Sequence, residues 1–252
     1  MKSDREDEGF DEAGLIDREA DFSPFGSYCP HFISDPVMTQ RWDDVLFVSW
    51  PVAVDQLAAR LPAGLWPDEW NGSAWVSLVP FMMRDSRYRD RRLPTGSFPE
   101  VNVRAYVVGP EGPGVWFASL DVPSLLPKAV ANRVYGLNYR WSRVTVSKDA
   151  NWVDWSVRRR PRGPRGHVRG HIGQPVSPTG LDQFLTARWR LYAGRKGLVT
   201  ARVEHRPWEL HEATVEGLDL GLVNAAGLHP RNSPWVRWSP GTDVTVERPV
   251  SL

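Results

Sequence analysis

The chain has 252 residues, and its 41% hydrophobic and 24% charged content is typical of a globular protein that buries a substantial core. Its net charge is +1, and its single cysteine, Cys29, excludes both an intrachain disulfide and a multi-cysteine metal site. With 21 glycines and 22 prolines, the composition favours short strands and turns over long helices.

The first 25 residues differ in charge from the rest of the chain. They carry a net charge of −6, since nine Asp or Glu residues accompany only Lys2, Arg5 and Arg18, and this leaves about +7 on the remainder. An acidic segment with few aromatic residues is typical of a disordered tail, and a docking arm is the alternative. We therefore predict an acidic, disordered arm over residues 1–37 and a single domain over residues 38–252.

The sequence also indicates where the protein resides. The first residues lack the basic-then-apolar order of a secretory signal, and no uncharged apolar run approaches the ~20 residues that a membrane helix needs. We expect a cytoplasmic protein that does not bind membranes. The sequence leaves open whether the chain forms a homo-oligomer.

Apolar and turn-forming residues predict a domain made mostly of strands. In chain order, the patterns favour a strand at 45–50, a helix at 54–61, a strand at 74–83, an exposed loop at 84–97, strands at 98–108 and 115–120, a helix at 124–135, strands at 141–147, 151–158, 199–203 and 208–216, a helix at 218–226 and a strand at 242–247. Turns rather than helical crossovers connect neighbouring strands. The prediction is an α+β fold, mainly an antiparallel sheet or barrel with a few packed helices, large enough to enclose a ligand cavity.

The strand at 98–108 alternates between polar and apolar residues. Because side chains alternate along a strand, its polar face holds Glu100, Asn102, Arg104 and Tyr106. The apolar face would then pack on a helix-covered outer core, and the polar face would line the interior of the barrel. Buried charges are tolerated there when they are paired and hydrogen-bonded. A solvent-facing polar surface on a one-sided sheet remains the alternative.

Two other polar groupings have ordinary structural explanations. The basic run at 158–166 contains prolines and glycines but no interleaved aromatic residues, which favours a solvated hairpin loop over a nucleic-acid site. The histidine pairs His167/His171 and His205/His211 lie among prolines, glycines or strand residues, without the helical i, i+4 context of a zinc protease motif, so we expect no metal site. The sequence has no Gly-rich phosphate loop, and we expect no cofactor and no nucleic-acid partner.

Several blocks together resemble the YqjF-like bacterial proteins, a domain-of-unknown-function family. The resemblance spans about residues 38–252 and rests on Phe98-Pro-Glu-Val-Asn-Val-Arg-Ala-Tyr106, Gly114-Val-Trp-Phe-Ala-Ser-Leu-Asp121, Phe184-Leu-Thr-Ala-Arg-Trp-Arg-Leu-Tyr192, Val203-Glu-His-Arg-Pro-Trp208 and Ser239-Pro-Gly-Thr-Asp-Val244. This resemblance implies the fold of acetoacetate decarboxylase, a cone-like antiparallel barrel around a cavity, and it implies that Glu100 takes the place of that enzyme's active-site glutamate.

The chain departs from the decarboxylase at the lysine that forms the Schiff base. The decarboxylase motif Gly-Arg-Glu-x-x-Gly-x-Pro-Lys-Lys is similar to residues 132–140 here, where Arg133 and Gly136 fit but Tyr139 and Arg140 stand at the lysine pair. A Schiff base needs a primary amine with a lowered pKa, which neither side chain supplies. The resemblance therefore implies a related cavity without imine chemistry.

From these observations we predict a protein that binds a small molecule in an interior polar cavity. The predicted lining residues are Glu100, Asn102, Arg104, Tyr106, Arg133 and Tyr139, with His205 and Trp208 at the cavity mouth. One hypothesis is an enzyme on a carbonyl or carboxylate compound, in which Arg104 or Arg133 holds the carboxylate and Glu100 acts as acid or base. The alternative is a ligand-binding or structural protein without catalysis.

The acidic arm provides a first test. Because residues 1–25 are highly charged and lack apolar periodicity, their deletion should leave the melting temperature within a few degrees of the full chain. Circular dichroism melting of both proteins measures this. A large decrease would mean that these residues pack on the domain.

Overall fold

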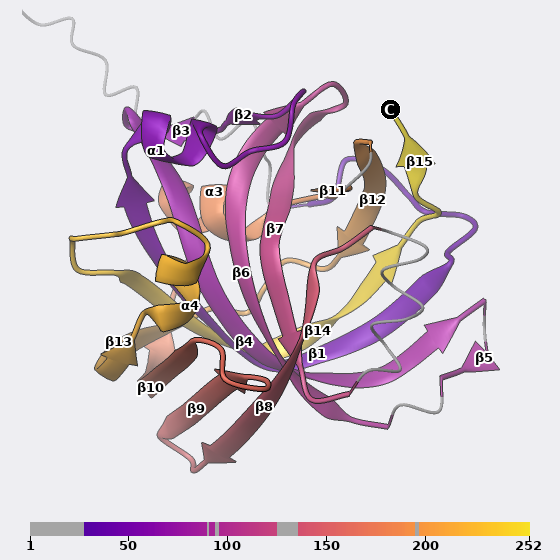
Figure 1. Cartoon of the computed structure of the whole chain (residues 1–252). Helices are drawn as coiled ribbons and strands as arrows, with labels where there is room; N and C mark the ends of the chain where they lie inside the picture. Colours follow the sequence, from indigo (N-terminus) through magenta and orange to yellow (C-terminus); the bar gives the residue numbers. More distant parts are fainter. Residues whose placement is uncertain (1–27, 90, 94–95, 125–135, 195–196) are drawn as a thin grey trace, which may run out of the picture.

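The strands of the described residues all belong to one 15-stranded sheet (Figure 1). The computed structural model describes residues 28–252 except 90, 94–95, 125–135 and 195–196. The strands are β1 (Met38–Val52), β2 (Trp66–Pro67), β3 (Glu69–Trp70), β4 (Ser73–Tyr88), β5 (Arg91–Arg92), β6 (Phe98–Gly109), β7 (Gly112–Val122), β8 (Tyr139–Lys148), β9 (Trp152–Arg159), β10 (Arg165–Pro175), β11 (Arg190–Ala193), β12 (Val199–His205), β13 (His211–Asp219), β14 (Trp235–Val246) and β15 (Val250–Ser251). The described helices are α1 (Val54–Ala58), α3 (Gly180–Thr186) and α4 (Gly221–Ala225).

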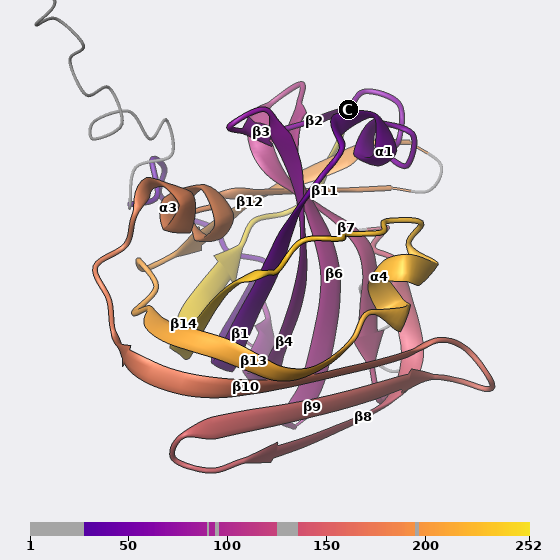
Figure 2. The ribbon, with the colours of Figure 1, turned by 90° about the vertical axis from the view of Figure 1, so that its left-hand side faces the viewer.

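The strand pairings form two closed circuits that share a wall. One circuit runs from β7 through β8, β9, β10, β13, β14, β1, β4 and β6, and a β6–β7 pairing closes it. The other runs from β7 through β11 and β12 to β14, and then through the same β1, β4 and β6. Most pairings are antiparallel, while β7 pairs in parallel with both β8 and β11. Figure 2 shows β8, β9, β10 and β13 side by side beneath the rest of the sheet.

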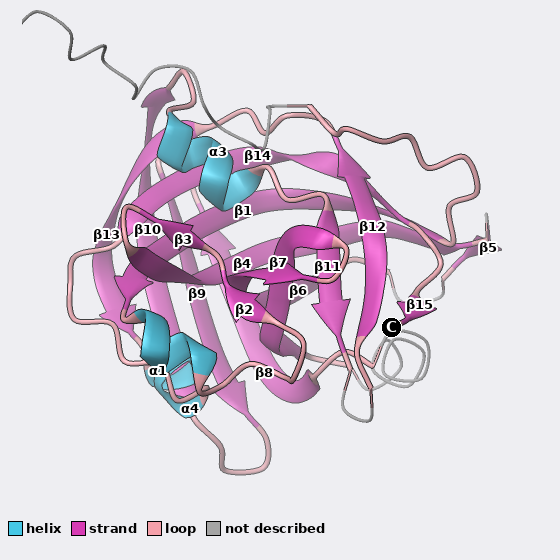
Figure 3. Cartoon of the chain, turned by 90° about the horizontal axis from the view of Figure 1, so that it is seen from above, coloured by secondary structure: helices cyan, strands magenta, loops and turns pink. Residues whose placement is uncertain are grey.

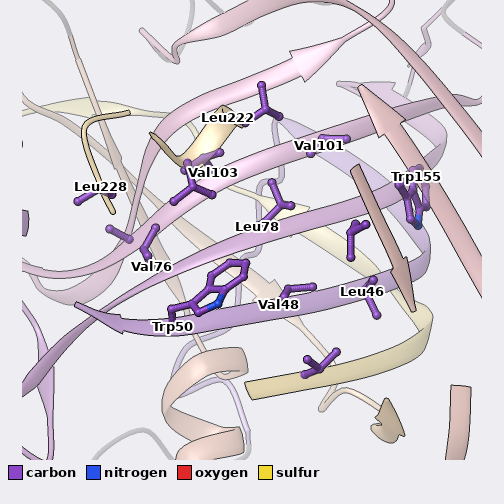
Figure 4. Close-up of a cluster of buried hydrophobic side chains, with 14 of the residues drawn as sticks. Leu46, Val48, Trp50, Val76, Leu78, Val101, Val103, Trp155, Leu222 and Leu228 are labelled. Atoms are coloured by element: carbon purple, nitrogen blue, oxygen red, sulfur yellow. The ribbon is translucent and has the colours of Figure 1, made fainter. Parts of the chain in front are cut away.

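The first circuit is filled by hydrophobic side chains. Figure 4 shows Trp50 of β1 and Val103 of β6 in the same cluster as Trp155 of β9 and Leu222 of α4. All four side chains are almost completely buried. The apolar face of β6 therefore packs on an outer core that α4 helps to cover, as the alternation of the strand predicts. In the view from above, α3 lies apart from α1 and α4 (Figure 3).

Local sequence signals explain two of the elements. The β6–β7 hairpin has only two residues between Gly109 and Gly112, and Gly112 takes a φ of 97° that favours glycine. Helix α3 begins with a capping box, in which Thr179 Oγ1 accepts a hydrogen bond from the Asp182 backbone at 3.2 Å and the Asp182 carboxylate accepts one from the Thr179 backbone at 2.7 Å.

The sequence predicts a mostly-β fold with few helices, and the structure confirms this. The predicted loop at 84–97 is wrong in part, because β4 continues to Tyr88, where it pairs with Met38 of β1, and β5 follows at Arg91–Arg92. Strands β10 and β11 and helix α3 were not predicted. The predicted helix at 124–135 falls on residues 125–135, outside the described part of the chain.

The predicted start of the domain at residue 38 is too late in the sequence. Within the described residues 28–37, Ile33 and Val37 are buried. The Ile33 backbone donates to the Glu204 carboxylate at 2.8 Å, and the Val37 backbone donates to the Val246 carbonyl at 3.0 Å. This stretch packs on β12 and β14, so only residues 1–27 remain as the predicted arm, and they lie outside the described residues.

Candidate functional site

A cavity lies inside the second circuit. Its volume is about 80 Å³. Its walls come from the shared strands and from β11, β12 and the end of α3: Met38, Gln40, Trp42, Met83, Glu100, Asn102, Arg104, Val115, Phe117, Leu120, Leu137, Tyr139, Thr186, Arg188, Leu191, Val203, His205, Trp208, Val244 and Val246. It is therefore an interior site with polar and apolar sections.

Strand β6 brings three polar side chains to this cavity. Glu100, Asn102 and Arg104 line it and expose only 2%, 1% and 5% of their surface. They occupy alternate positions, so the face opposite the hydrophobic cluster carries them all. The polar face of this strand is thus buried in the protein rather than exposed to water.

The fourth residue of that face, Tyr106, lies behind Arg104 and is not among the lining residues. Its hydroxyl donates to the Leu185 carbonyl at 2.9 Å and lies 2.7 Å from the hydroxyl of Ser77, which in turn contacts Ser49 at 2.6 Å. Arg104 Nη2 donates to the same Leu185 carbonyl at 2.9 Å. Tyr106 and Arg104 therefore both bind the carboxyl end of α3.

Two further side chains bind the last carbonyl groups of α3. Arg188 Nε donates to the Phe184 carbonyl at 2.6 Å, and Trp208 Nε1 donates to the Thr186 carbonyl at 3.2 Å. Arg188 also forms an ion pair with Asp68 at 2.5 Å. These donors satisfy carbonyl groups that have no partner within a helix, and the guanidinium charges complement the negative end of its dipole.

The polar residues of β6 retain unsatisfied atoms at the cavity. Within the described part of the chain, Glu100 Oε2, Asn102 Oδ1 and Arg104 Nε are buried and have no hydrogen-bond partner. No ion pair between described residues includes Arg104. Buried polar groups without partners are uncommon and costly, and three of them occur together at this wall.

Burial changes the acid–base properties of Glu100. Its pKa is raised from 4.5 to about 8, chiefly by desolvation and to a smaller extent by the negative charge of Asp121, while a hydrogen bond with Asn102 opposes the shift. At neutral pH the Glu100 carboxyl group is therefore mostly protonated. In this state it can donate a proton or a hydrogen bond to a bound molecule.

His205 is uncharged for the same reason. Its pKa is lowered from 6.5 to about 4, chiefly by desolvation and to a smaller extent by the positive charge of Arg104, while a hydrogen bond to the Arg206 carbonyl opposes both effects. With Nδ1 donating to that carbonyl at 2.7 Å, Nε2 is the unprotonated nitrogen. The His205 ring lies between those of Trp189 and Trp208, at centroid distances of 4.4 and 5.1 Å.

The other predicted site residues have different outcomes. Tyr139, His205 and Trp208 line the cavity, and His205 and Trp208 also line a small neighbouring hollow beside Pro178. Arg133 lies outside the described residues. His211 is not among the lining residues.

The two histidines of β10 contact carboxylate side chains. His167 contacts Asp154 at 3.1 Å, and His171 contacts Glu216 at 3.0 Å, each on a neighbouring strand. Among the described residues, no group of three potential ligands could hold a metal ion. Of the helices in that part of the chain, none is long and apolar enough to cross a membrane.

Sequence reasoning missed several lining residues. Arg188 and Thr186 belong to the block at 184–192 that resembles the YqjF-like family, but the capping box before this block was not used to predict α3. Gln40 and Trp42 lie on the part of β1 that precedes the predicted strand at 45–50. Their bond, from Trp42 Nε1 to Gln40 Oε1 at 2.8 Å, places both side chains at the cavity.

Comparison with known proteins identifies the family. The DUF2071 family model, "Uncharacterized conserved protein", matches residues 39–243. The chain belongs to this family. It is also 34% identical over 216 residues to the uncharacterized protein YqjF of Bacillus subtilis (strain 168), and the match covers 82% of this chain and 89% of that protein.

Solved structures of acetoacetate decarboxylase-like enzymes share the fold. The enduracididine biosynthesis enzyme MppR complexed with pyruvate aligns with a TM-score of 0.63, at 15% identity, over 88% of this chain and 92% of that one. An acetoacetate decarboxylase-like enzyme from Sphingomonas wittichii RW1 has a TM-score of 0.62 at 15% identity, covering 88% and 97% of the two chains. An acetoacetate decarboxylase has a TM-score of 0.65 at 12% identity, covering 90% and 91%. At such identities the likeness shows the fold alone.

The raised pKa of Glu100 predicts a pH dependence of stability. The unfolded chain loses this proton near pH 4.5 and the folded chain near pH 8, so the free energy of unfolding falls as pH rises between these values. His205 has the opposite effect between pH 4 and 6.5. Above pH 6.5 only the Glu100 effect remains, and Glu100→Gln should abolish a decline of roughly 1 kcal/mol per pH unit.

Urea unfolding between pH 6.5 and 8 measures this slope in both proteins. Glu212→Gln, at an exposed position of β13, is the matched control and should leave the slope unchanged. Equal slopes in the parent and Glu100→Gln would show that Glu100 titrates at an ordinary pH.

Proposed function

We propose that this protein binds a small organic acid in its cavity, with Arg104 as the residue that holds the carboxylate. The observation that carries the proposal is a buried guanidinium group at the cavity wall that has no carboxylate partner among the described residues. A buried charge without a counter-ion is costly, and a bound carboxylate would supply two strong hydrogen bonds as well as the missing charge.

The charges around the cavity support an anionic ligand. Arg188 is balanced by Asp68, His205 is neutral above pH 4, and Glu100 is mostly protonated at neutral pH. Arg104 therefore leaves the cavity with one net positive charge. Attraction between this charge and an anion is strong because the apolar walls keep the local dielectric constant low.

The proposal extends to chemistry on a carbonyl group beside the carboxylate. A protonated Glu100 can donate a hydrogen bond to the carbonyl oxygen and polarise the carbonyl group. Asn102 contacts Glu100 and orients it. The similar fold of MppR, solved with pyruvate, supports a small oxo acid as a first probe. A protein that binds the acid without transforming it is the alternative.

The fold and location form part of the same proposal. We infer that the two closed circuits of strands amount to a barrel-like cone, whose interior is the ligand cavity. Residues 1–27 would then form the acidic arm outside it. A cytoplasmic protein acting on a soluble metabolite fits this arrangement.

Pyruvate and acetone test the role of Arg104. Pyruvate should raise the melting temperature, because a ligand that binds only the folded state stabilises it, whereas the uncharged acetone should not. Replacement of Arg104 by methionine should weaken pyruvate binding at least tenfold in calorimetric titration, as expected for loss of a charge-assisted hydrogen bond.

Two further variants complete this experiment. Arg143→Met, at an exposed position of β8, is the matched control and should bind pyruvate normally. Arg104 also binds α3, so its replacement could act through the helix. Asn102→Leu leaves the α3 contacts intact and should also weaken pyruvate binding. Unchanged pyruvate affinity in both cavity variants would refute the proposed site.

The absence of a lysine at the decarboxylase position predicts that no imine forms. Three lysines follow the acidic arm. The structure describes one of them, Lys148, which pairs with Asp44 on the outer surface. The other two, Lys128 and Lys196, lie outside the described residues. Treatment with pyruvate or acetoacetate and borohydride should therefore leave the intact mass unchanged. A reduced adduct mapped to Lys128 would restore a Schiff-base enzyme.

A further inference from the structure

The apolar section of the cavity limits what else the bound acid can contain. Strands β7, β11, β12 and β14 contribute Val115, Leu120, Leu191, Val203 and Val244 to the lining. The five side chains belong to one hydrophobic cluster or pack against it. From these strands, His205 at the end of β12 is the one polar lining residue in the described chain. Apart from His205, the side chains of this section therefore offer no hydrogen-bond partner to a ligand.

The charged lining side chains are confined to β6 and to the segment after α3, while Gln40, Tyr139 and the neutral His205 are further polar lining residues. Glu100, Asn102 and Arg104 come from β6, and Thr186 and Arg188 come from the end of α3 and the residues after it. A ligand with a single charged end can satisfy this section while the rest of the molecule lies against the apolar strands. Polar groups on the rest of the ligand would lose their hydrogen bonds to water without replacement.

The size of the cavity sets the length of the ligand. A cavity of about 80 Å³ holds about six water-sized groups, at roughly 10–15 Å³ for each group. The carboxylate occupies part of this space. Side-chain adjustment would allow about seven or eight non-hydrogen atoms in total, of which the carboxylate takes three and about four or five are left for the body of the ligand.

We propose that the cavity selects a monocarboxylate with an apolar body of about four or five carbon atoms, straight or branched. This inference rests on the proposed function and specifies its substrate class. It excludes sugar acids and dicarboxylates, because a hydroxyl group or a second charge would lie against Val115, Leu191 or Val244. A cavity with this preference also differs from one that accepts only acids of two or three carbon atoms.

A series of straight-chain acids tests the inference by calorimetric titration. Affinity should rise about three- to fourfold for each added methylene group from acetate through butyrate to hexanoate, and then fall for octanoate. Hexanamide, with the same body and no charge, should bind at least tenfold more weakly than hexanoate. Adipate, which has the same chain length with a second carboxylate, should not bind measurably.

A variant in the apolar section locates the ligand body. Val203 is half-buried on β12, so Val203→Phe can fill the apolar section without disrupting the core. It should weaken hexanoate binding at least tenfold and leave acetate binding unchanged. Val199→Phe is the matched control, since Val199 is also half-buried on β12 but is not a lining residue.

The outcomes separate this inference from the proposed function. If pyruvate and the straight-chain acids bind with affinities independent of chain length, or if adipate binds as well as hexanoate, the apolar-body inference is wrong and the carboxylate site stands. If no acid of the series binds, and pyruvate does not bind either, both proposals are wrong. Equal loss of hexanoate binding in Val203→Phe and Val199→Phe would also overturn the placement of the ligand body.

Discussion

The arrangement of the cavity depends on how the short helix α3 ends. A helix of this length cannot form stably by itself, and its last carbonyl groups need partners from elsewhere in the protein. Arg104, Tyr106, Arg188 and Trp208 supply them from β6 and from the segments that follow α3 and β12. The same side chains form or support the cavity wall. Folding of α3 and assembly of the site are therefore one event.

This arrangement gives Arg104 two tasks that use different atoms. Its Nη2 atom donates to the Leu185 carbonyl, while its Nε atom has no partner among the described residues. The ring faces of Phe47 and Tyr106, at 5.4 and 5.5 Å from the guanidinium carbon, limit its movement. A guanidinium group fixed in this way loses little conformational entropy when it binds an anion. In the proposed function, stability and ligand recognition thus share one side chain.

The sequence was sufficient for the main features of the fold and for part of the site. Alternation along 98–108 separates the two faces of β6, because one face packs in a hydrophobic cluster and the other carries polar side chains. Alternation alone left open whether the polar face is buried. Tyr106 shows the limit of this argument, since sharing a face with Arg104 does not decide which side chain reaches the cavity and which lies behind it. Arg188 could not be placed, because its position depends on α3 and on an ion pair with Asp68, which is distant in sequence.

The short strand β11 was missed by the sequence analysis for a physical reason. Strand β11 has four residues and takes its position from parallel pairing with β7 and antiparallel pairing with β12. Gly114 permits this approach, since a Cβ atom there would lie 2.7 Å from the Arg190 carbonyl oxygen. Such a strand has too few residues to show a pattern of its own. Only contacts distant in sequence define it, and a local analysis cannot detect them.

The shared wall has a consequence for how this family can evolve. Along β6, odd-numbered positions such as Val101 and Val103 contribute to the hydrophobic cluster, and even-numbered positions such as Asn102 and Arg104 contribute to the cavity. Two kinds of selection therefore act on neighbouring residues of one strand. Substitutions at even positions can alter ligand choice while the fold persists, but an insertion or deletion of one residue would exchange the two faces at once. New specificities should accordingly arise in this strand by replacement and not by change of length.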